Sequence, residues 1–245
     1  TAFSPILCPI LLILLKTGLK SAGVENGVVS LLGQPIVALA LGLLISGLLN
    51  YNRLRGKAFF KSATYLPNIC AVIAMGIIFS MLFEKNTGLI NEVIFAMGAN
   101  KVDWLTGTRF SKIPVIALNV WRNTPWFTMI LLSGLLNISP EYYEAAKVDG
   151  ANAFQRFFKI TLPSLSNVMF FCFITLTADS WKIFNEPFML QGPGTSNVSL
   201  FQYMYESGFN VFKLGYASSI GCMLTLILLI VSVIQFIIRM KQGEV

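Results

Sequence analysis

Five long apolar runs constrain this chain more than any other feature. A hydrocarbon core of about 30 Å needs about 20 apolar residues in a helix. Runs of about that length are Val28–Leu49, Thr64–Phe83, Ile113–Leu136, Leu165–Phe184 and Tyr216–Ile238. A sixth run, Phe3–Leu15, is apolar but shorter. The sequence therefore predicts an all-α, polytopic transmembrane bundle of about six helices, forming a single domain over residues 1–245.

The composition supports a bilayer as the surrounding solvent. Of the 245 residues, 55% are hydrophobic and 12% are charged, whereas a soluble domain carries about 25% charged residues. The chain has no histidine, which removes the commonest general base and metal ligand. We therefore expect no catalytic residues and no metal site. The net charge of +7 could suit nucleic acid, but the basic residues lie at the ends of the apolar runs, so we expect no nucleic-acid partner.

Basic residues between the runs predict the orientation of the chain. The segment Asn50–Lys61 carries four basic residues and no acidic residue, which is typical of a cytoplasmic loop. Alternating crossings then place Glu84–Lys112 outside, Asn137–Ser164 inside and Gln191–Lys213 outside. The tail from Arg239 onward is expected in the cytoplasm.

The cytoplasmic segment at residues 139–163 predicts two short helices. Ser139 is a favourable N-cap and Pro140 suits the first helical position. Gly150 can end that helix with a positive φ. A second helix should follow, with an apolar side formed by phenylalanines and Leu162, and Pro163 should end it. Two such helices would protrude from the membrane.

The same segment resembles the EAA loop of binding-protein-dependent ABC importers. The pattern is Glu-Ala-Ala, Gly, Ile and Leu-Pro at fixed spacing. The alternative, an ordinary amphipathic loop, does not account for so many matches. The resemblance implies that this loop docks on an ATPase subunit and couples ATP hydrolysis to transport. The residues it assigns to coupling are Glu144, Ala145, Ala146, Asp149, Gly150, Ile160, Leu162 and Pro163.

Flanking residues are similar to the carbohydrate-uptake branch, and in particular to the larger subunit of maltose permeases. They include Ile138–Ala146, Asn50–Phe60 and Gly215–Ser218. The resemblance implies import of a sugar or oligosaccharide across the bacterial cytoplasmic membrane. It also implies four kinds of partner: a second permease subunit, two ATP-binding cassette subunits, an extracytoplasmic solute-binding protein and the lipid bilayer. ATP and Mg²⁺ would bind to the ATPase subunits, so this chain would hold no cofactor and would not itself be an enzyme.

Polar residues inside two runs mark a candidate substrate pathway. The resemblance places the substrate cavity near Arg122, Asn123, Trp126, Asp179, Trp181 and Lys182. Because Asp179 and Lys182 are three residues apart on a helix, they could simply pair, and the group could be a buried structural network. Arg122 and Lys182 could instead indicate a charged solute.

Two other functions remain open from the sequence. A permease for amino acids or peptides would share the EAA loop and differ in its flanking residues. An ion-coupled secondary transporter would use intramembrane acidic residues and would not need a protruding EAA loop.

Overall fold

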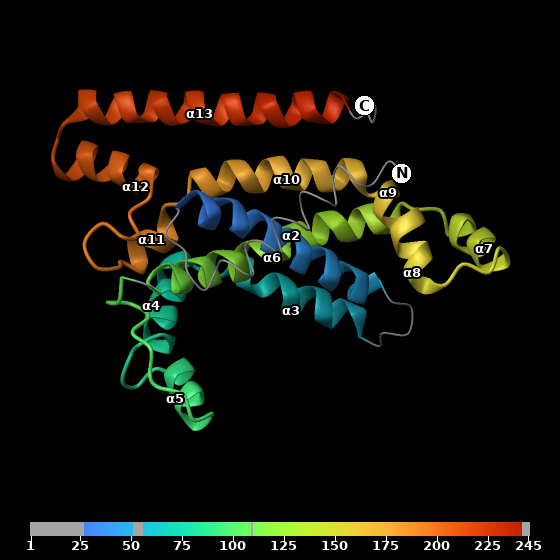
Figure 1. Cartoon of the computed structure of the whole chain (residues 1–245), viewed down its shortest axis with the longest axis horizontal. Coiled ribbons are helices and arrows are strands. Elements are labelled where there is room, and N and C mark those ends of the chain that lie inside the picture. Colours follow the sequence, from blue (N-terminus) through green and yellow to red (C-terminus); the bar gives the residue numbers. More distant parts are fainter. Residues whose placement is uncertain (1–26, 51–55, 109, 242–245) are drawn as a thin grey trace. The chain divides into compact units, whose positions relative to one another are not determined.

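The computed structural model describes residues 27–50, 56–108 and 110–241, which are helical with no strand among them (Figure 1). The α-helices are α2 (Gly27–Asn50), α3 (Lys57–Ile69), α4 (Val72–Leu82), α5 (Leu89–Ala96), α6 (Lys112–Leu136), α7 (Pro140–Val148), α8 (Ala153–Arg156), α9 (Leu162–Ser164), α10 (Ser166–Trp181), α11 (Asn185–Met189), α12 (Leu200–Tyr205) and α13 (Leu214–Lys241). Two π-helical turns, Phe157–Thr161 and Glu206–Asn210, follow α8 and α12.

Four of the predicted apolar runs coincide with single helices. These helices are α2, α6, α10 and α13, and their ends lie within a few residues of the predicted ends. The run Phe3–Leu15 lies outside the described residues. The all-α prediction is confirmed, while the number of membrane spans remains a prediction.

The run Thr64–Phe83 is not one continuous helix, contrary to the prediction. Ala71 leaves helical backbone, with φ −60° and ψ 127°, and a new helix starts at Val72. Pro67 does not cause the break, because it lies inside α3. An unbroken apolar run shows that a segment can be buried, but it does not fix whether its backbone stays helical. Lys57 and Lys61, predicted in a loop, also belong to α3.

Length and apolar character identify few unambiguous spans among the described residues. By these criteria only α13 could cross a membrane as a single helix. Two interrupted pairs, α3 with α4 and the segment Ala153–Ser164 with Ser166–Met189, would raise the total to three. At 25 residues α6 is long enough, but several polar side chains interrupt its apolar surface.

The chain divides into two compact units. The first contains the described residues up to Ile69 together with Val120–Thr175. Its core is built by close approach of α6 to its neighbours. A Cβ on Gly134 would lie 2.8 Å from a methyl carbon of Leu165. Small residues at such contacts let membrane helices approach closely, and Leu131 and Leu165 are fully buried there.

The second unit contains Cys70–Asn119 and Leu176–Val245. Its core packs Val115, Leu118 and Leu190 against partly buried apolar side chains. Helix α4 lies so close to α11 that a Cβ on Gly76 would come within 2.6 Å of the Cβ of Met189.

One buried amide organises the segment between α4 and α6 in this second unit. The Asn91 side chain is fully buried. Its Nδ2 donates to the carbonyls of Glu84, Lys85 and Val102, and its Oδ1 accepts from the Val102 N–H and the indole N–H of Trp104. These bonds join the start of the segment to residues more than ten positions away.

Two carboxylates stabilise the turns on either side of this amide. Hydrogen bonds from Thr87, its backbone N–H first, lower the pKa of Glu84. The hydroxyl of Thr106 similarly lowers the pKa of Asp103. The segment is therefore held by its own local bonds.

Candidate functional site

The predicted coupling loop forms a helix with defined caps in the first unit. Helix α7 begins after Ser139, whose hydroxyl accepts a hydrogen bond from the Glu141 N–H, and Pro140 occupies the first turn. Both features confirm the prediction. The acidic Glu141 in the first turn and the basic Lys147 in the last turn suit the helix dipole.

Helix α7 ends in a Schellman motif centred on Gly150. The Gly150 N–H donates to the Lys147 carbonyl at 3.1 Å, and the Ala151 N–H donates to the Ala146 carbonyl at 2.9 Å. Gly150 has φ +73°, and this left-handed conformation is accessible to glycine at little cost. A Cβ at Gly150 would contact nothing within 4 Å. The backbone conformation, rather than crowding, therefore favours glycine here.

The second predicted helix is shorter than expected. A capping box between Asn152 and Gln155 starts α8, which has only four residues before a π-helical turn begins. Pro163 does not end the helical run, contrary to the prediction, because it lies in the first turn of α9, where a missing N–H costs nothing. The run instead bends by more than 40° at Leu165.

A single hydrogen bond joins α7 to the turn that leads into α10. The hydroxyl oxygens of Tyr143 and Thr161 lie 2.9 Å apart. Thr161 is buried and is the last residue of the π-helical turn. A movement of α7 would therefore act directly on the start of the α9–α10 segment. The sequence analysis missed this pair, although Tyr143 directly precedes the Glu-Ala-Ala motif.

The motif residues separate into an exposed group and an inner group. Glu144, Ala145, Asp149 and Gly150 are exposed at or beside α7. The α7–α8 segment extends beyond the ends of the neighbouring long helices of its unit (Figure 1). The other motif residues are buried or half-buried: Ala146, Ile160, Leu162 and Pro163. The exposed group is accessible to a partner, and the inner group anchors the loop.

The first half of the predicted substrate pathway lies on α6 in the first unit. Arg122 and Asn123 are half-buried and Trp126 is exposed. The Arg122 carbonyl accepts a hydrogen bond from Asn68 Nδ2 at 3.3 Å. This contact links α6 to α3.

The second half lies at the end of α10 in the second unit. The Lys182 ammonium and the Asp179 carboxylate form an ion pair at 3.3 Å, and each side chain is about half exposed. The structural alternative raised by their spacing is thus observed. The indole N–H of Trp181 is buried and donates to none of the described residues.

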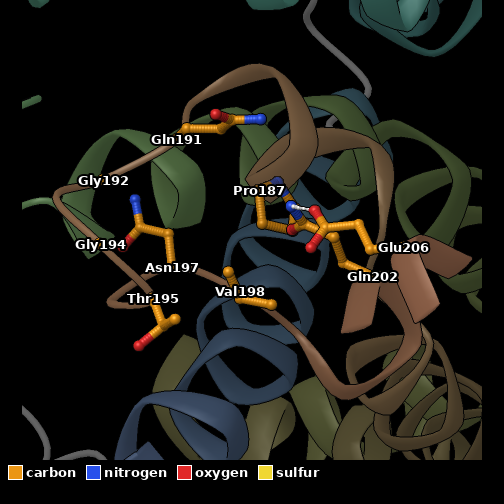
Figure 2. A pocket seen from close by; sticks show the side chains of 9 residues that line it. All are labelled: Pro187, Gln191, Gly192, Gly194, Thr195, Asn197, Val198, Gln202 and Glu206. Atoms are coloured by element: carbon orange, nitrogen blue, oxygen red, sulfur yellow. Dashed lines mark hydrogen bonds between the residues drawn. The ribbon is translucent and has the colours of Figure 1, made fainter. Parts of the chain in front are cut away.

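A polar pocket of about 220 Å³ lies elsewhere in the second unit (Figure 2). It is enclosed by the loop after α11 and by α12 with the π-helical turn that follows. Its lining residues are Pro187, Gln191, Gly192, Gly194, Thr195, Asn197, Val198, Gln202 and Glu206. The sequence analysis noted only Gln191–Gly194 here. The four-residue spacing of Gln202 and Glu206 was the available signal for their contact.

Comparison with known proteins relates most of the chain to one family. The family described as "Binding-protein-dependent transport system inner membrane component" matches residues 38–242. The arabinooligosaccharides transport system permease protein of Bacillus subtilis is 32% identical over 204 residues, which are 82% of this chain and 65% of that protein. The trehalose/maltose transport system permease protein of Thermococcus litoralis is 33% identical over 210 residues, 83% of this chain and 68% of that protein. The chain thus spans about two thirds of the length of these relatives.

A solved structure shares the fold. It is the crystal structure of a bacterial ABC transporter involved in the import of the acidic polysaccharide alginate, with a TM-score of 0.73. The match covers 92% of this chain and 83% of that chain at 18% sequence identity. At this identity the likeness shows the fold alone.

Proposed function

The chain belongs to the family of inner membrane components of binding-protein-dependent transport systems, and from this premise we propose that it is a permease subunit of an ATP-driven importer for sugars or oligosaccharides. The family match over residues 38–242 carries the proposal. The two relatives described above are named for arabinooligosaccharides and for trehalose and maltose. These names support a carbohydrate as the solute class rather than an amino acid or peptide.

Helix α7 is proposed to contact the ATPase subunit. Its exposed residues Glu144, Ala145 and Asp149 are available to a partner, and Ala145 keeps one side of the helix slim. Two long-range features would transmit its movement: the Tyr143–Thr161 hydrogen bond and the continuous helical run into α10. When ATP closes the ATPase subunits, the displacement of α7 would turn the helical bundle from its inward-facing to its outward-facing state.

The remaining parts of the importer follow from this proposal. A second, similar permease subunit would pair with this chain in the bacterial cytoplasmic membrane, with about six spans in each and the C-terminus in the cytoplasm. Two ATP-binding cassette subunits would bind ATP and Mg²⁺ below. A soluble binding protein would deliver the solute from outside. The polar residues on α6 and at the end of α10 would line the solute's path.

Reconstitution of the complete importer in liposomes tests the proposal. Uptake of labelled maltose and arabinotriose should require internal ATP and external binding protein. Glu144→Ala should reduce uptake, because it removes an exposed motif carboxylate, whereas Glu141→Ala on the same helix should not. Sugar uptake driven by an ion gradient without ATP would indicate a secondary transporter. ATP-dependent uptake of amino acids instead of sugars would contradict the solute class.

A further inference from the structure

Two side-chain amides in the pocket of the second unit are oriented so that only acceptors remain. Both N–H groups of Asn197 are used, since Nδ2 donates to the carbonyls of Ser111 and Leu190, each at 2.9 Å. These two carbonyls can only accept, so the Asn197 amide is fixed with Oδ1 as its remaining polar atom. That oxygen is buried and has no hydrogen-bond partner among the described residues.

Gln202 on the other side of the pocket is fixed in the same way. Its Nε2 donates to a carboxylate oxygen of Glu206 at 2.8 Å, as Figure 2 shows. The acceptor again dictates which end of the amide carries the protons. Gln202 is 2% exposed, and its Oε1 is buried without a partner among the described residues. The pocket therefore presents two amide oxygens and the Glu206 carboxylate.

The loop that carries Asn197 is built closely around it. A Cβ on Gly192 would lie 2.4 Å from Ser196 Oγ and 2.9 Å from the Asn197 amide. Gly194 has φ +60°, a conformation that favours glycine. The position of the Asn197 amide is thus set by the surrounding backbone, and its free oxygen is a fixed feature of the site.

These features select a positively charged group with N–H donors. Carbonyl and carboxylate oxygens accept hydrogen bonds and attract cations, and no basic residue lines the pocket. A volume of about 220 Å³ lies below the range of about 300–1,000 Å³ for small-molecule sites, so an oligosaccharide does not fit. A single metal ion would use little of this space, and only one carboxylate lines it. A primary ammonium carries three N–H donors, which matches the three acceptor groups.

We propose that this pocket receives one lysine side chain of the solute-binding protein when that protein docks. The proposal rests on the proposed function, which places the loop before α12 on the outer side of the membrane. The Glu206 carboxylate would pair with the ammonium, and the oxygens of Asn197 and Gln202 would accept its other N–H groups. Charge complementarity at such a contact orients the partner and adds affinity when water is excluded.

Docking of the binding protein to the whole importer in nanodiscs tests this assignment. Glu206→Gln should raise the Kd of the binding protein at least about tenfold, because truncating a shielded charge pair is costly. Glu92→Gln is the matched control, since Glu92 is an exposed carboxylate on α5 that pairs with Lys101, away from the pocket. An unchanged Kd in Glu206→Gln would overturn the proposal.

Two measurements on the unmodified importer remain informative if the variant does not assemble. n-Butylammonium should compete with the binding protein, whereas tetramethylammonium at equal ionic strength should not, because it has no N–H donor. A carbodiimide joins a carboxylate to an amine as an amide with loss of water, so it should link Glu206 to a lysine of the docked binding protein.

The outcomes separate this proposal from the proposed function. Equal effects of the two ammonium ions, or no amide link at Glu206, would overturn the lysine pocket while the importer still transports sugar. Thermal stabilisation by Ca²⁺ that Glu206→Gln abolishes, without any effect of n-butylammonium, would assign the pocket to a metal ion and also overturn it. Failure of the wild-type importer to bind any solute-binding protein would contradict the proposed function itself.

Discussion

The hydroxyl oxygens of Tyr143 and Thr161 lie 2.9 Å apart, which ties the exposed helix α7 to the turn that precedes α10. Thr161 is buried and Tyr143 is half-buried. The bond therefore bridges the part of the loop that is accessible to a partner and the part that packs in the unit. It is the most direct connection between the two groups of motif residues.

Removing this bond should weaken coupling more than folding. We expect Tyr143→Phe to cost about 1 kcal/mol of local stability, the usual net value of one hydrogen bond. The solute imported per ATP hydrolysed should fall severalfold, because α7 would move with less effect on α10. Uptake and ATP hydrolysis measured together in proteoliposomes check this.

The exposed neighbour Tyr142 offers the matched control. Tyr142→Phe should leave the ratio of uptake to hydrolysis unchanged. A double-mutant cycle with Thr161→Val should show that the two hydroxyls act together. Additive effects of Tyr143→Phe and Thr161→Val would contradict a shared bond.

The left-handed backbone at Gly150 gives a second prediction. Gly150→Val should destabilise the end of α7 by about 1–2 kcal/mol, because a β-branched residue is disfavoured at φ +73°. ATP hydrolysis should then become uncoupled from uptake. Gly150→Asn should retain most coupling, since asparagine tolerates this conformation and no atom crowds the site. Normal coupling in Gly150→Val would contradict the prediction.

Local signals predicted the caps of α7 because each cap depends on adjacent residues. Ser139 and Gly150 act on N–H and carbonyl groups within five positions, so their residue types are sufficient evidence. The apolar runs likewise predicted the long helices. The interruption at Ala71 and the bend at Leu165 were missed, because composition does not record where an apolar backbone leaves the helix.

The pocket could not be predicted for a different reason. The orientation of Asn197 depends on the carbonyl of Ser111, 86 positions earlier in the chain. No local pattern in the sequence brings these two residues together. Only the folded second unit shows that the amide oxygen, rather than its nitrogen, remains available.

The buried amide of Asn91 gives a third prediction. Asn91→Leu should destabilise the segment between α4 and α6 by about 3 kcal/mol, since several buried partners would lose a hydrogen bond at once. The Tm of the purified importer should fall. Asn86→Leu, at an exposed position in the same segment, should have little effect. Equal Tm values for the two variants would show that the Asn91 bonds do not stabilise the segment.

The pairing of Lys182 with Asp179 changes what is expected of the two basic residues on the candidate pathway. An ion pair between half-exposed side chains contributes about 0–1 kcal/mol, and Asp179 already balances the Lys182 charge. Lys182→Gln should therefore leave transport within about twofold of wild type, a free-energy change below about 0.5 kcal/mol. Arg122→Gln should reduce transport more strongly if the solute is anionic, because this half-buried charge is costly to hold inside a membrane without a compensating group.

Transport of neutral and acidic oligosaccharides by both variants makes this comparison, after assembly with the ATPase subunits has been verified. Selective loss of acidic solutes in Arg122→Gln would assign the arginine to solute recognition. Full transport of every solute by both variants would show that neither charge recognises the solute. A stronger loss in Lys182→Gln than in Arg122→Gln would contradict the role given to the Asp179 pair, since a neutralised ammonium should attract an anion less than Arg122 does.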